Sequence, residues 1–440
     1  MILLIFVTFW GILSYFRNKK HFFLISLVVV ISSGLGFVPG SVTIEDLTLV
    51  MGITILLGES LMGNKVLSTS NDPIGKIILL ILAYYFLNVV WTFVQGRETL
   101  AFGLKVFRRD LFYIYYFVFK KISITDLKRA FKPILVLTVI GGICYYLQFV
   151  GIHLLAGSSE DLKAAKGGFV RYTNTPMLGL PFMIYYIVKK DNIKFVYLLF
   201  FIGFLIMPMS RGGIMAAAVS LAYFIWSNGR FDKYKKVVAK LLLLLLLFSP
   251  VLIWRFVKDN ERGNAMQDIT SASTIGNYSD FEYDDGGTFT FRVALAMERF
   301  DYMTHHPESL LFGVGTIHEK SPNNHFKFYI GTNSLRDDGY IEKLSIDTED
   351  IAFISHIFRY GFVYFFLFVY FIILCFIRIK EDMHNNAVGA VGFIFFLMIT
   401  LNSPSSDVYS FLRIMLIPLL TIALIQNYNK TILNKNFPIK

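Results

Sequence analysis

Arginine and histidine side chains that interrupt apolar stretches are the residues of this sequence best suited to chemistry. The set comprises Arg108, Arg171, Arg211, Arg292, His356, Arg359 and Arg413. An ionisable group inside a hydrocarbon layer costs free energy, so one that is kept there is a functional candidate. A guanidinium group stays protonated and donates two parallel hydrogen bonds, which suits the geometry of phosphate. If several of these arginines converge on one cavity, they form a site for a strongly anionic group.

Two of these positions coincide with an expected helix start. Arg211 follows Pro208-Met209-Ser210 and precedes Gly212-Gly213, so free backbone N–H groups of the next helix would point at the same place. His356 and Arg359 are three residues apart and share one face of a later helix. These positions therefore predict anion binding near the ends of helices.

Each candidate also has a purely structural explanation. Arg211 fits an ordinary loop charge, and Arg108 with its neighbour Arg109 fits snorkelling or an ion pair with Asp110. A single His in an apolar segment is often hydrogen-bonded packing. Asp347, Glu349 and Asp350 immediately precede the His356 helix, where acidic charge favours the helix N-terminus. Both interpretations stay open at this point.

Metal binding is not expected. His305, His306, His318 and His325 lie in one acidic loop, but their spacings match no standard zinc site. Glu282-Tyr283-Asp284 is an acidic triplet of a kind that holds divalent ions in some glycosyltransferases, and such short triplets are common by chance. Phosphate-binding, metalloprotease and serine-hydrolase motifs are missing from the sequence. We expect no metal and no cofactor.

The elements that position these residues are apolar spans. The 440 residues are 55% hydrophobic and 17% charged, whereas soluble domains carry about 25% charged residues. Cys144 and Cys375 both lie in apolar stretches, so no disulfide framework is expected. Spans long enough for a membrane are expected at roughly 1–16, 21–38, 42–61, 74–94, 103–119, 133–153, 173–188, 193–209, 211–227, 236–256, 352–377, 386–402 and 408–426.

Lys and Arg in the short connections predict the orientation of these spans. If the loop 257–350 is external, the internal connections hold 23 basic residues and the short external ones hold 5. This places the C-terminus in the cytoplasm and the N-terminus in the periplasm. Arg17, Lys19 and Lys20 follow the first apolar span rather than precede it, so we interpret that span as a helix and not as a secretory signal.

The loop 257–350 resembles a soluble unit. It carries 8 basic and 17 acidic residues, so the net positive charge of the chain lies in the other connections. The positive charge is therefore explained by membrane topology and does not indicate nucleic-acid binding. Asp284-Asp285-Gly286-Gly287 and Ser321-Pro322-Asn323-Asn324 are typical of turns. A helix is expected over 292–304, ending at His305-His306-Pro307, with an apolar stripe that faces either a core or the bilayer surface. The stripe consists of Val293, Ala296, Met297, Phe300 and Met303.

The predicted organisation is an all-α polytopic membrane protein. We expect about 12–13 transmembrane helices, with short helices in one long periplasmic loop. The expected units are an N-terminal transmembrane bundle over 1–256, the external loop over 257–350, and C-terminal transmembrane helices with a short tail over 351–440.

The order of several motifs within this topology resembles the superfamily of O-antigen polymerases and O-antigen ligases. Ser210-Arg211-Gly212 lies between two late spans, and Gly-Phe-Val-Arg171-Tyr-Thr-Asn-Thr-Pro176 is similar to that family's arginine-containing loop before a helix. The external loop carries Arg292 and then Pro307-Glu-Ser-Leu-Leu-Phe-Gly-Val-Gly315. An acidic segment leads into a helix with Tyr360-Gly361. The resemblance covers about the last two thirds of the chain.

This resemblance implies a glycosyl transfer between undecaprenyl-diphosphate-linked sugars at the outer face of the bacterial inner membrane. The transfer would be inverting and independent of metal. Arg211, Arg171 and Arg292 would bind the diphosphate, with Arg108, Arg359 and Arg413 as further candidates, and Asp350 or His356 would be the catalytic base. The implied partners are the lipid-linked donor and acceptor and the bilayer, with a chain-length regulator and a flippase as further candidates.

Other functions stay open. Ligases of this superfamily typically place a His-Asn-type pair at the helix after the loop, whereas this chain has Asp347-Thr-Glu-Asp350, which weakly favours a polymerase over a ligase. A flippase for lipid-linked oligosaccharides would also need a cationic cavity, but open to both sides in turn. A transporter for another anion would place its charges near the midplane, in discontinuous helices.

Overall fold

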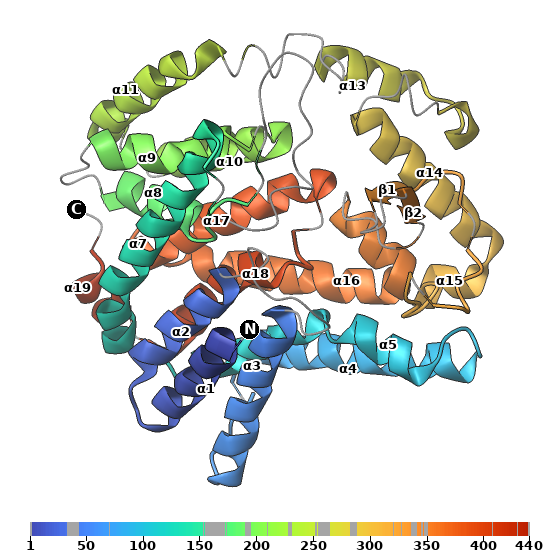
Figure 1. The fold of residues 1–440 in the computed structure, drawn as a ribbon, viewed down its shortest axis with the longest axis horizontal. Coiled ribbons are helices and arrows are strands. Elements are labelled where there is room, and N and C mark those ends of the chain that lie inside the picture. Colours follow the sequence, from blue (N-terminus) through green and yellow to red (C-terminus); the bar gives the residue numbers. More distant parts are fainter. Residues whose placement is uncertain are drawn as a thin grey trace.

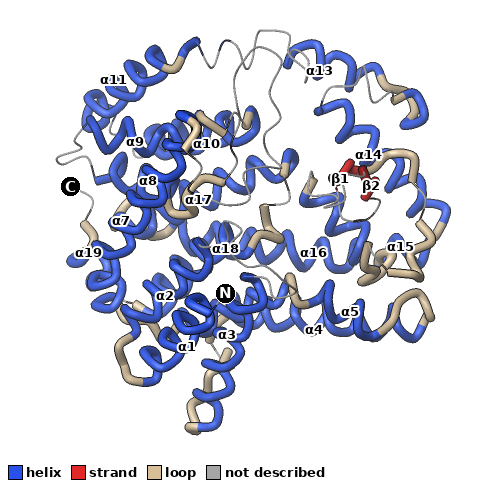
Figure 2. Tube along the Cα trace, viewed as in Figure 1, coloured by secondary structure: helices blue, strands red, loops and turns tan. Residues whose placement is uncertain are grey.

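Helices form nearly all of the regular structure in this protein (Figures 1 and 2). The computed structural model describes residues 2–32, 44–69, 71–152, 154, 172, 174–189, 195–208, 210–227, 231–250, 253, 265–281, 288–319, 321–326, 328–335, 341–344, 346, 351–406, 408–428 and 430–438. A small antiparallel hairpin of β1 (Thr332–Leu335) and β2 (Ile341–Leu344) lies in the long loop, where only helices were expected. The predicted class, an all-α polytopic membrane protein, is confirmed.

The helices follow one another along the chain. They are α1 (Ile2–Phe16), α2 (Lys20–Ser32), α3 (Ile44–Leu61), α4 (Pro73–Val94), α5 (Leu100–Phe107), η1 (Asp110–Ile114), α6 (Tyr115–Phe119), α7 (Ile124–Leu147), η2 (Gln148–Val150), α8 (Gly179–Lys189), α9 (Phe195–Ile206), α10 (Arg211–Ser227), α11 (Phe231–Leu247), α13 (Ala265–Thr274), η3 (Tyr278–Asp280), α14 (Thr288–His305), α15 (Pro307–Phe312), α16 (Ala352–Lys380), α17 (Ala387–Asn402), η4 (Ser403–Ser405), α18 (Leu412–Asn427) and α19 (Lys430–Asn436).

Several helices are suited to crossing a membrane. Among the described residues, those both long and apolar enough are Pro73–Val94, Ile124–Val150, Ala352–Lys380 and Ala387–Ser405. Shorter apolar helices accompany them, for example α1, α2, α8 and α18. The stretch 103–119, expected as one span, is divided into α5, η1 and α6, and the division falls at Arg108, Arg109 and Asp110.

The second section of α16 packs along α4, while α10 and α18 pack against α17 (Figure 1). Helices α14 and α15 and the hairpin gather beside one end of α16, and the C-terminal helix α19 lies at the opposite side of the molecule (Figure 1). The elements within 257–350 therefore cover one end of the helical bundle (Figure 1).

Helix α16 is broken at Gly361. This residue has φ 75° and ψ 179°, a conformation that essentially only glycine adopts. The break frees the carbonyl groups of residues 358–360 from helical hydrogen bonding, and buried carbonyls need partners. Their donors are the N–H of Val314 (2.9 Å), the N–H of Gly315 (3.0 Å) and the hydroxyl of Tyr84 on α4 (2.7 Å), in that order. The loop and α4 thus complete the broken helix.

Two glycines allow the loop to approach this break. A Cβ atom on Gly361 would come within 2.2 Å of the Leu311 carbonyl oxygen, and one on Gly313 within 2.1 Å of the Arg359 carbonyl oxygen. Gly313 also has a positive φ of 77°. The Leu311–Gly315 segment and the Tyr360-Gly361 step, which are distant in sequence, therefore form one interlocked junction.

The first section of α16, residues 352–360, folds back along the second section. The rings of His356 and Phe368 are 5.0 Å apart, and those of Phe353 and Phe365 are 5.9 Å apart. Twelve residues of a straight helix would separate such positions by about 18 Å. The span expected at 352–377 is therefore a helical hairpin with its turn at Gly361, and it carries the candidate residue His356 next to the membrane-spanning section.

Helix α14 is confirmed, but its most buried face differs from the expected stripe. Ala294, Leu295, Glu298 and Arg299 are buried, whereas of the expected stripe only Met303 is. Glu298 and Arg299 form an ion pair of 2.7 Å. Glu298 accepts a hydrogen bond from the Ile330 N–H (3.0 Å), and Arg299 donates one to the Ile330 carbonyl oxygen (2.8 Å). The most buried face of α14 thus contains an ion pair and lies beside the expected apolar stripe rather than on it.

We expect Gly361→Ala to destabilise the protein by about 3 kcal/mol or more, because a side chain there combines backbone strain with a clash against backbone. The measurement is thermal unfolding of the purified protein in detergent. Gly63→Ala is the control, since Gly63 also has a positive φ (80°) but no atom within 4 Å of an added Cβ. If both variants lose the same stability, the close packing at the junction contributes nothing beyond the backbone strain.

Glu298→Ala should loosen the packing of the 257–350 loop. It removes the carboxylate that pairs with the buried Arg299, and breaking a buried ion pair costs about 3–5 kcal/mol. Limited trypsin digestion should then cut within 257–350 faster than in wild type. The control is Glu308→Ala, which removes a more exposed ion pair with Arg97 (3.4 Å) and should cost under about 1 kcal/mol. Unchanged digestion of the Glu298 variant would contradict the role of this ion pair.

Candidate functional site

The connection between α17 and α18, residues 403–411, is the place where several of the predicted site residues meet. It starts with a polar turn in which the Ser405 hydroxyl lies 2.7 Å from Asn402 Oδ1 and 2.9 Å from the Asn402 carbonyl oxygen. Pro404 lies in this turn and cannot donate a backbone hydrogen bond, so the helix ends here. The turn leaves the Ser405 carbonyl free to accept hydrogen bonds from other segments.

Arg292 and the start of α10 both reach Ser405. The Arg292 guanidinium donates a hydrogen bond of 2.9 Å from Nη2 to the Ser405 carbonyl oxygen. Gly212 packs so closely on the turn that an added Cβ would lie 2.2 Å from Ser405 Oγ and 2.7 Å from Asn402 Oδ1. Because Arg211 is the first residue of α10, the structure brings Arg211 and Arg292 to the same turn.

The local electrostatics of this turn favour an anion. The hydroxyl of Ser210 accepts a hydrogen bond from the Gly213 N–H (3.3 Å), as a helix-capping residue does. Helix α10 therefore begins at Arg211, and the positive end of its dipole lies at the turn that the Arg292 guanidinium contacts. Arg211 itself is half-buried, which strengthens its interaction with charge.

His356 lies on the folded-back section of α16, next to the same connection. Its side chain is buried, and its ring is 5.5 Å from Tyr364 and 5.0 Å from Phe368. Phe368 in turn is 5.0 Å from the ring of Tyr409, which belongs to the α17–α18 connection. His356 is thus separated from that connection by one aromatic ring.

Three other candidate arginines have different surroundings. Arg359 is buried and donates a hydrogen bond to the Ile317 carbonyl oxygen (2.9 Å), so it holds the loop to α16. Arg108 forms an ion pair with Asp46 (2.7 Å) rather than with Asp110. Arg413 is exposed at the start of α18, 6.0 Å from the Phe411 ring. Arg413 lies near the connection, while Arg108 and Arg359 are engaged elsewhere.

Two predicted site residues, Arg171 and Asp350, lie outside the described residues. The acidic triplet Glu282-Tyr283-Asp284 and the turn predicted at 284–287 also lie outside them. In the described part of the chain, no three His, Cys, Asp or Glu side chains gather as a metal site would require. The second predicted turn is confirmed by the hydrogen bond from the Asn324 N–H to the Ser321 carbonyl oxygen (3.0 Å).

Sequence reasoning missed the polar groups that support the site. Asn402 and Ser405 stand in an Asn-Ser-Pro-Ser turn at the end of an apolar span, a signal that was visible but not used. Asp110, buried within an apolar stretch, accepts a hydrogen bond from the Tyr360 hydroxyl (2.8 Å) and so ties η1 to the break in α16. An acidic residue in such a stretch should itself have been a candidate.

One comparison with known proteins bears on the family resemblance. Residues 196–369 match the family model described as O-antigen ligase. No curated protein and no solved structure matches the chain. The matched range includes Arg211, Arg292, Asp350, His356 and Arg359, while Arg108, Arg171 and Arg413 lie outside it. The resemblance inferred from the motifs is therefore confirmed over residues 196–369, which match the O-antigen ligase family model.

Proposed function

We propose that this protein is a polysaccharide polymerase that joins undecaprenyl-diphosphate-linked oligosaccharide repeat units. The observation that carries the proposal is the meeting of Arg292 and the start of α10, with Arg211, at Ser405. The O-antigen ligase family domain contains both arginines and supports glycosyl transfer as the chemistry.

In the proposed reaction, a sugar hydroxyl attacks the anomeric carbon of a second chain from the face opposite its lipid diphosphate. The bond from that carbon to the diphosphate oxygen breaks, and negative charge develops on the leaving group. Guanidinium groups and helix N–H groups already positioned in a water-poor site stabilise this charge without a metal. A base accepts the proton of the attacking hydroxyl. Inversion at the anomeric carbon follows from a single displacement.

The proposed roles of the described residues follow from their contacts, and those of Arg171 and Asp350 follow from the family resemblance. Arg211 and Arg292 bind the diphosphate, and Arg171 and Arg413 extend the site. Asp350 or His356 is the base. Arg108 and Arg359, engaged with Asp46 and with the Ile317 carbonyl oxygen, contribute by holding α3 and the loop in place.

We further propose that the site faces the outer side of the bacterial inner membrane, with the C-terminus in the cytoplasm and the N-terminus in the periplasm. The excess of basic residues in the connections at the other side supports this orientation. The lipid-linked donor and acceptor would then enter from the bilayer, and the 257–350 loop would cover the site from the periplasm. A chain-length regulator and a flippase are proposed partners.

An O-antigen ligase, which transfers the glycan to lipid A-core or another acceptor, is the second candidate function. The description of the matched family favours it. The acidic Asp347-Thr-Glu-Asp350 segment before α16, in place of a His-Asn-type pair, supports the polymerase.

Arg211→Ala and Arg292→Ala should each reduce chain extension about 10²–10³-fold, as the loss of one preorganised donor does at other developing charges. The measurement is transfer by purified protein on a lipid-linked repeat unit. Arg378→Ala is the matched control, since Arg378 pairs with Glu381 (3.0 Å) near the other end of α16 and should leave the rate unchanged.

The same assay includes a chelator. Undiminished transfer is expected, because positive side chains supply the charge stabilisation. Loss of activity on chelation would instead assign the charge stabilisation to a metal at the acidic triplet. Wild-type rates in both arginine variants would exclude Arg211 and Arg292 from the mechanism.

Deletion of the gene separates the two candidate functions. Loss of a polymerase leaves single repeat units transferred to their acceptor, whereas loss of a ligase leaves the acceptor bare and polymer on its lipid carrier. We expect the first pattern on a gel of surface glycans. A wild-type gel would contradict both functions.

A further inference from the structure

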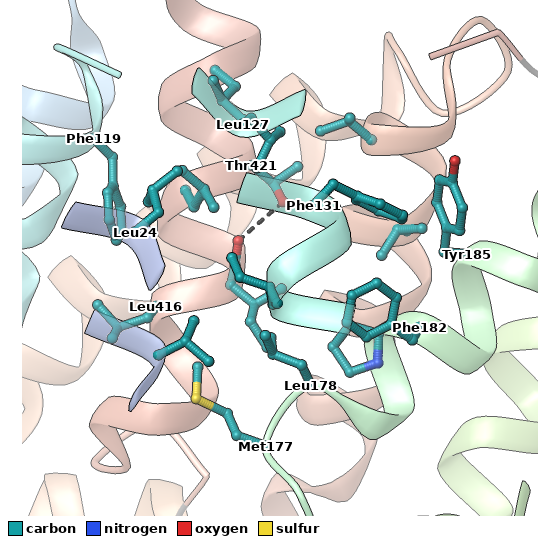
Figure 3. Close-up of a pocket in the computed structure, with 18 of the residues that line it drawn as sticks. Leu24, Phe119, Leu127, Phe131, Met177, Leu178, Phe182, Tyr185, Leu416 and Thr421 are labelled. Atoms are coloured by element: carbon teal, nitrogen blue, oxygen red, sulfur yellow. Dashed lines mark hydrogen bonds between the residues drawn. The ribbon is translucent and has the colours of Figure 1, made fainter. Parts of the chain in front are cut away.

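An apolar cavity lies among six helices in the described part of the bundle (Figure 3). Residues of α2, α6, α7, α8, α17 and α18 line it, together with Phe437, which follows α19. Figure 3 shows Leu24, Phe131, Phe182, Leu416 and Thr421 among the side chains that line it. Its volume is about 170 Å³.

The side chains that line the cavity favour binding of a hydrocarbon chain. Apart from Thr421 and Tyr185, the lining side chains are apolar. The Thr421 hydroxyl donates its hydrogen bond within its own helix, to the Ile417 carbonyl oxygen (3.0 Å). Apolar cavities of roughly 150 Å³ stay dry and bind small hydrocarbons such as benzene. The space therefore suits a segment of an alkyl chain.

The cavity and the proposed glycosyl-transfer site lie at opposite ends of α17. Ala387, Val388 and Val391 from the start of α17 line the cavity, whereas Asn402 ends the helix and Ser405 follows it. A helix of this length spans about 24 Å at 1.5 Å per residue. The cavity is thus separate from the turn where Arg211 and Arg292 meet.

Basic side chains stand at the cavity end of α7. Lys128 Nζ is 6.0 Å from the centre of the Phe437 ring, and Phe437 lines the cavity. Lys128, Arg129 and Lys132 are exposed on the first turns of α7, directly beside the lining residues Leu127 and Phe131. Basic clusters next to membrane helices attract anionic lipid headgroups.

We propose that this cavity binds an acyl chain of an anionic membrane phospholipid, with the phosphate of the lipid against Lys128, Arg129 and Lys132. The apolar walls take the hydrocarbon and the basic turn takes the charge, so both parts of one molecule are recognised. The lipid would fill the space between α7 and α17 and brace the bundle at the end opposite the glycosyl-transfer site.

Native mass spectrometry of the purified full-length protein tests this binding. The protein is incubated with equal amounts of phosphatidylglycerol and phosphatidylcholine, and retained lipid is counted. Phosphatidylglycerol should be retained about tenfold more than phosphatidylcholine. Ile134→Phe fills the cavity and should lower this retention about tenfold. The matched control is Val136→Phe, two residues along α7, where the side chain is 56% exposed and retention should not change.

A second pair of variants keeps the test decisive if Ile134→Phe does not fold. Val391→Leu should reduce retention by a smaller factor, and combined Lys128→Gln, Arg129→Gln and Lys132→Gln should bring phosphatidylglycerol down to the level of phosphatidylcholine. Equal retention of the two lipids by wild type, or undiminished retention in folded cavity-filled protein, would overturn the proposal. Arg211→Ala should retain lipid normally, so failure of the proposed glycosyl transfer and failure of lipid binding are separately visible.

Discussion

The hydrogen bonds that complete the broken helix α16 are the interaction on which the other parts of the structure depend. A helix interrupted inside an apolar bundle leaves carbonyl groups that water does not reach, so the protein must supply donors. Here the donors come from Val314 and Gly315 of the loop and from Tyr84 of α4. The fold-back at Gly361 is stable only where these segments are docked, because all three carbonyls would otherwise be buried without partners.

This junction connects the 257–350 loop to the candidate site through direct contacts. Asn88 of α4 donates a hydrogen bond to the Phe312 carbonyl oxygen (2.9 Å), and Thr92 Oγ1 accepts one from the Thr316 N–H (3.0 Å), so the loop is held on both sides of its glycines. The same loop continues to Ile330, which the Glu298-Arg299 pair fixes to α14. Since α14 carries Arg292, the reach of that guanidinium to Ser405 is set by a chain of contacts that begins at α16.

Sequence patterns predicted the local features of this arrangement and missed the long-range ones. Apolar periodicity and the Gly, Pro and charged residues that interrupt it are local signals that act over a few residues. They predicted the membrane spans, the helix ending at His305 and the order of the glycine-containing motifs. The pairing of Arg108 with Asp46 and the folding back of α16 depend on segments that meet only in three dimensions. The buried face of α14 was misjudged for a similar reason, because Glu298 can be buried only when a partner neutralises it.

The Ser210-Arg211-Gly212 step shows how a short motif acquires a physical meaning once its surroundings are known. Ser210 caps α10, and the glycine removes the side chain that would collide with Ser405. Any larger residue at position 212 would push the start of α10 away from the turn and take Arg211 with it. Each of the three residue types therefore has a different role: the serine caps the helix, the arginine supplies the charge, and the glycine allows the helix start to lie against the turn that Arg292 contacts.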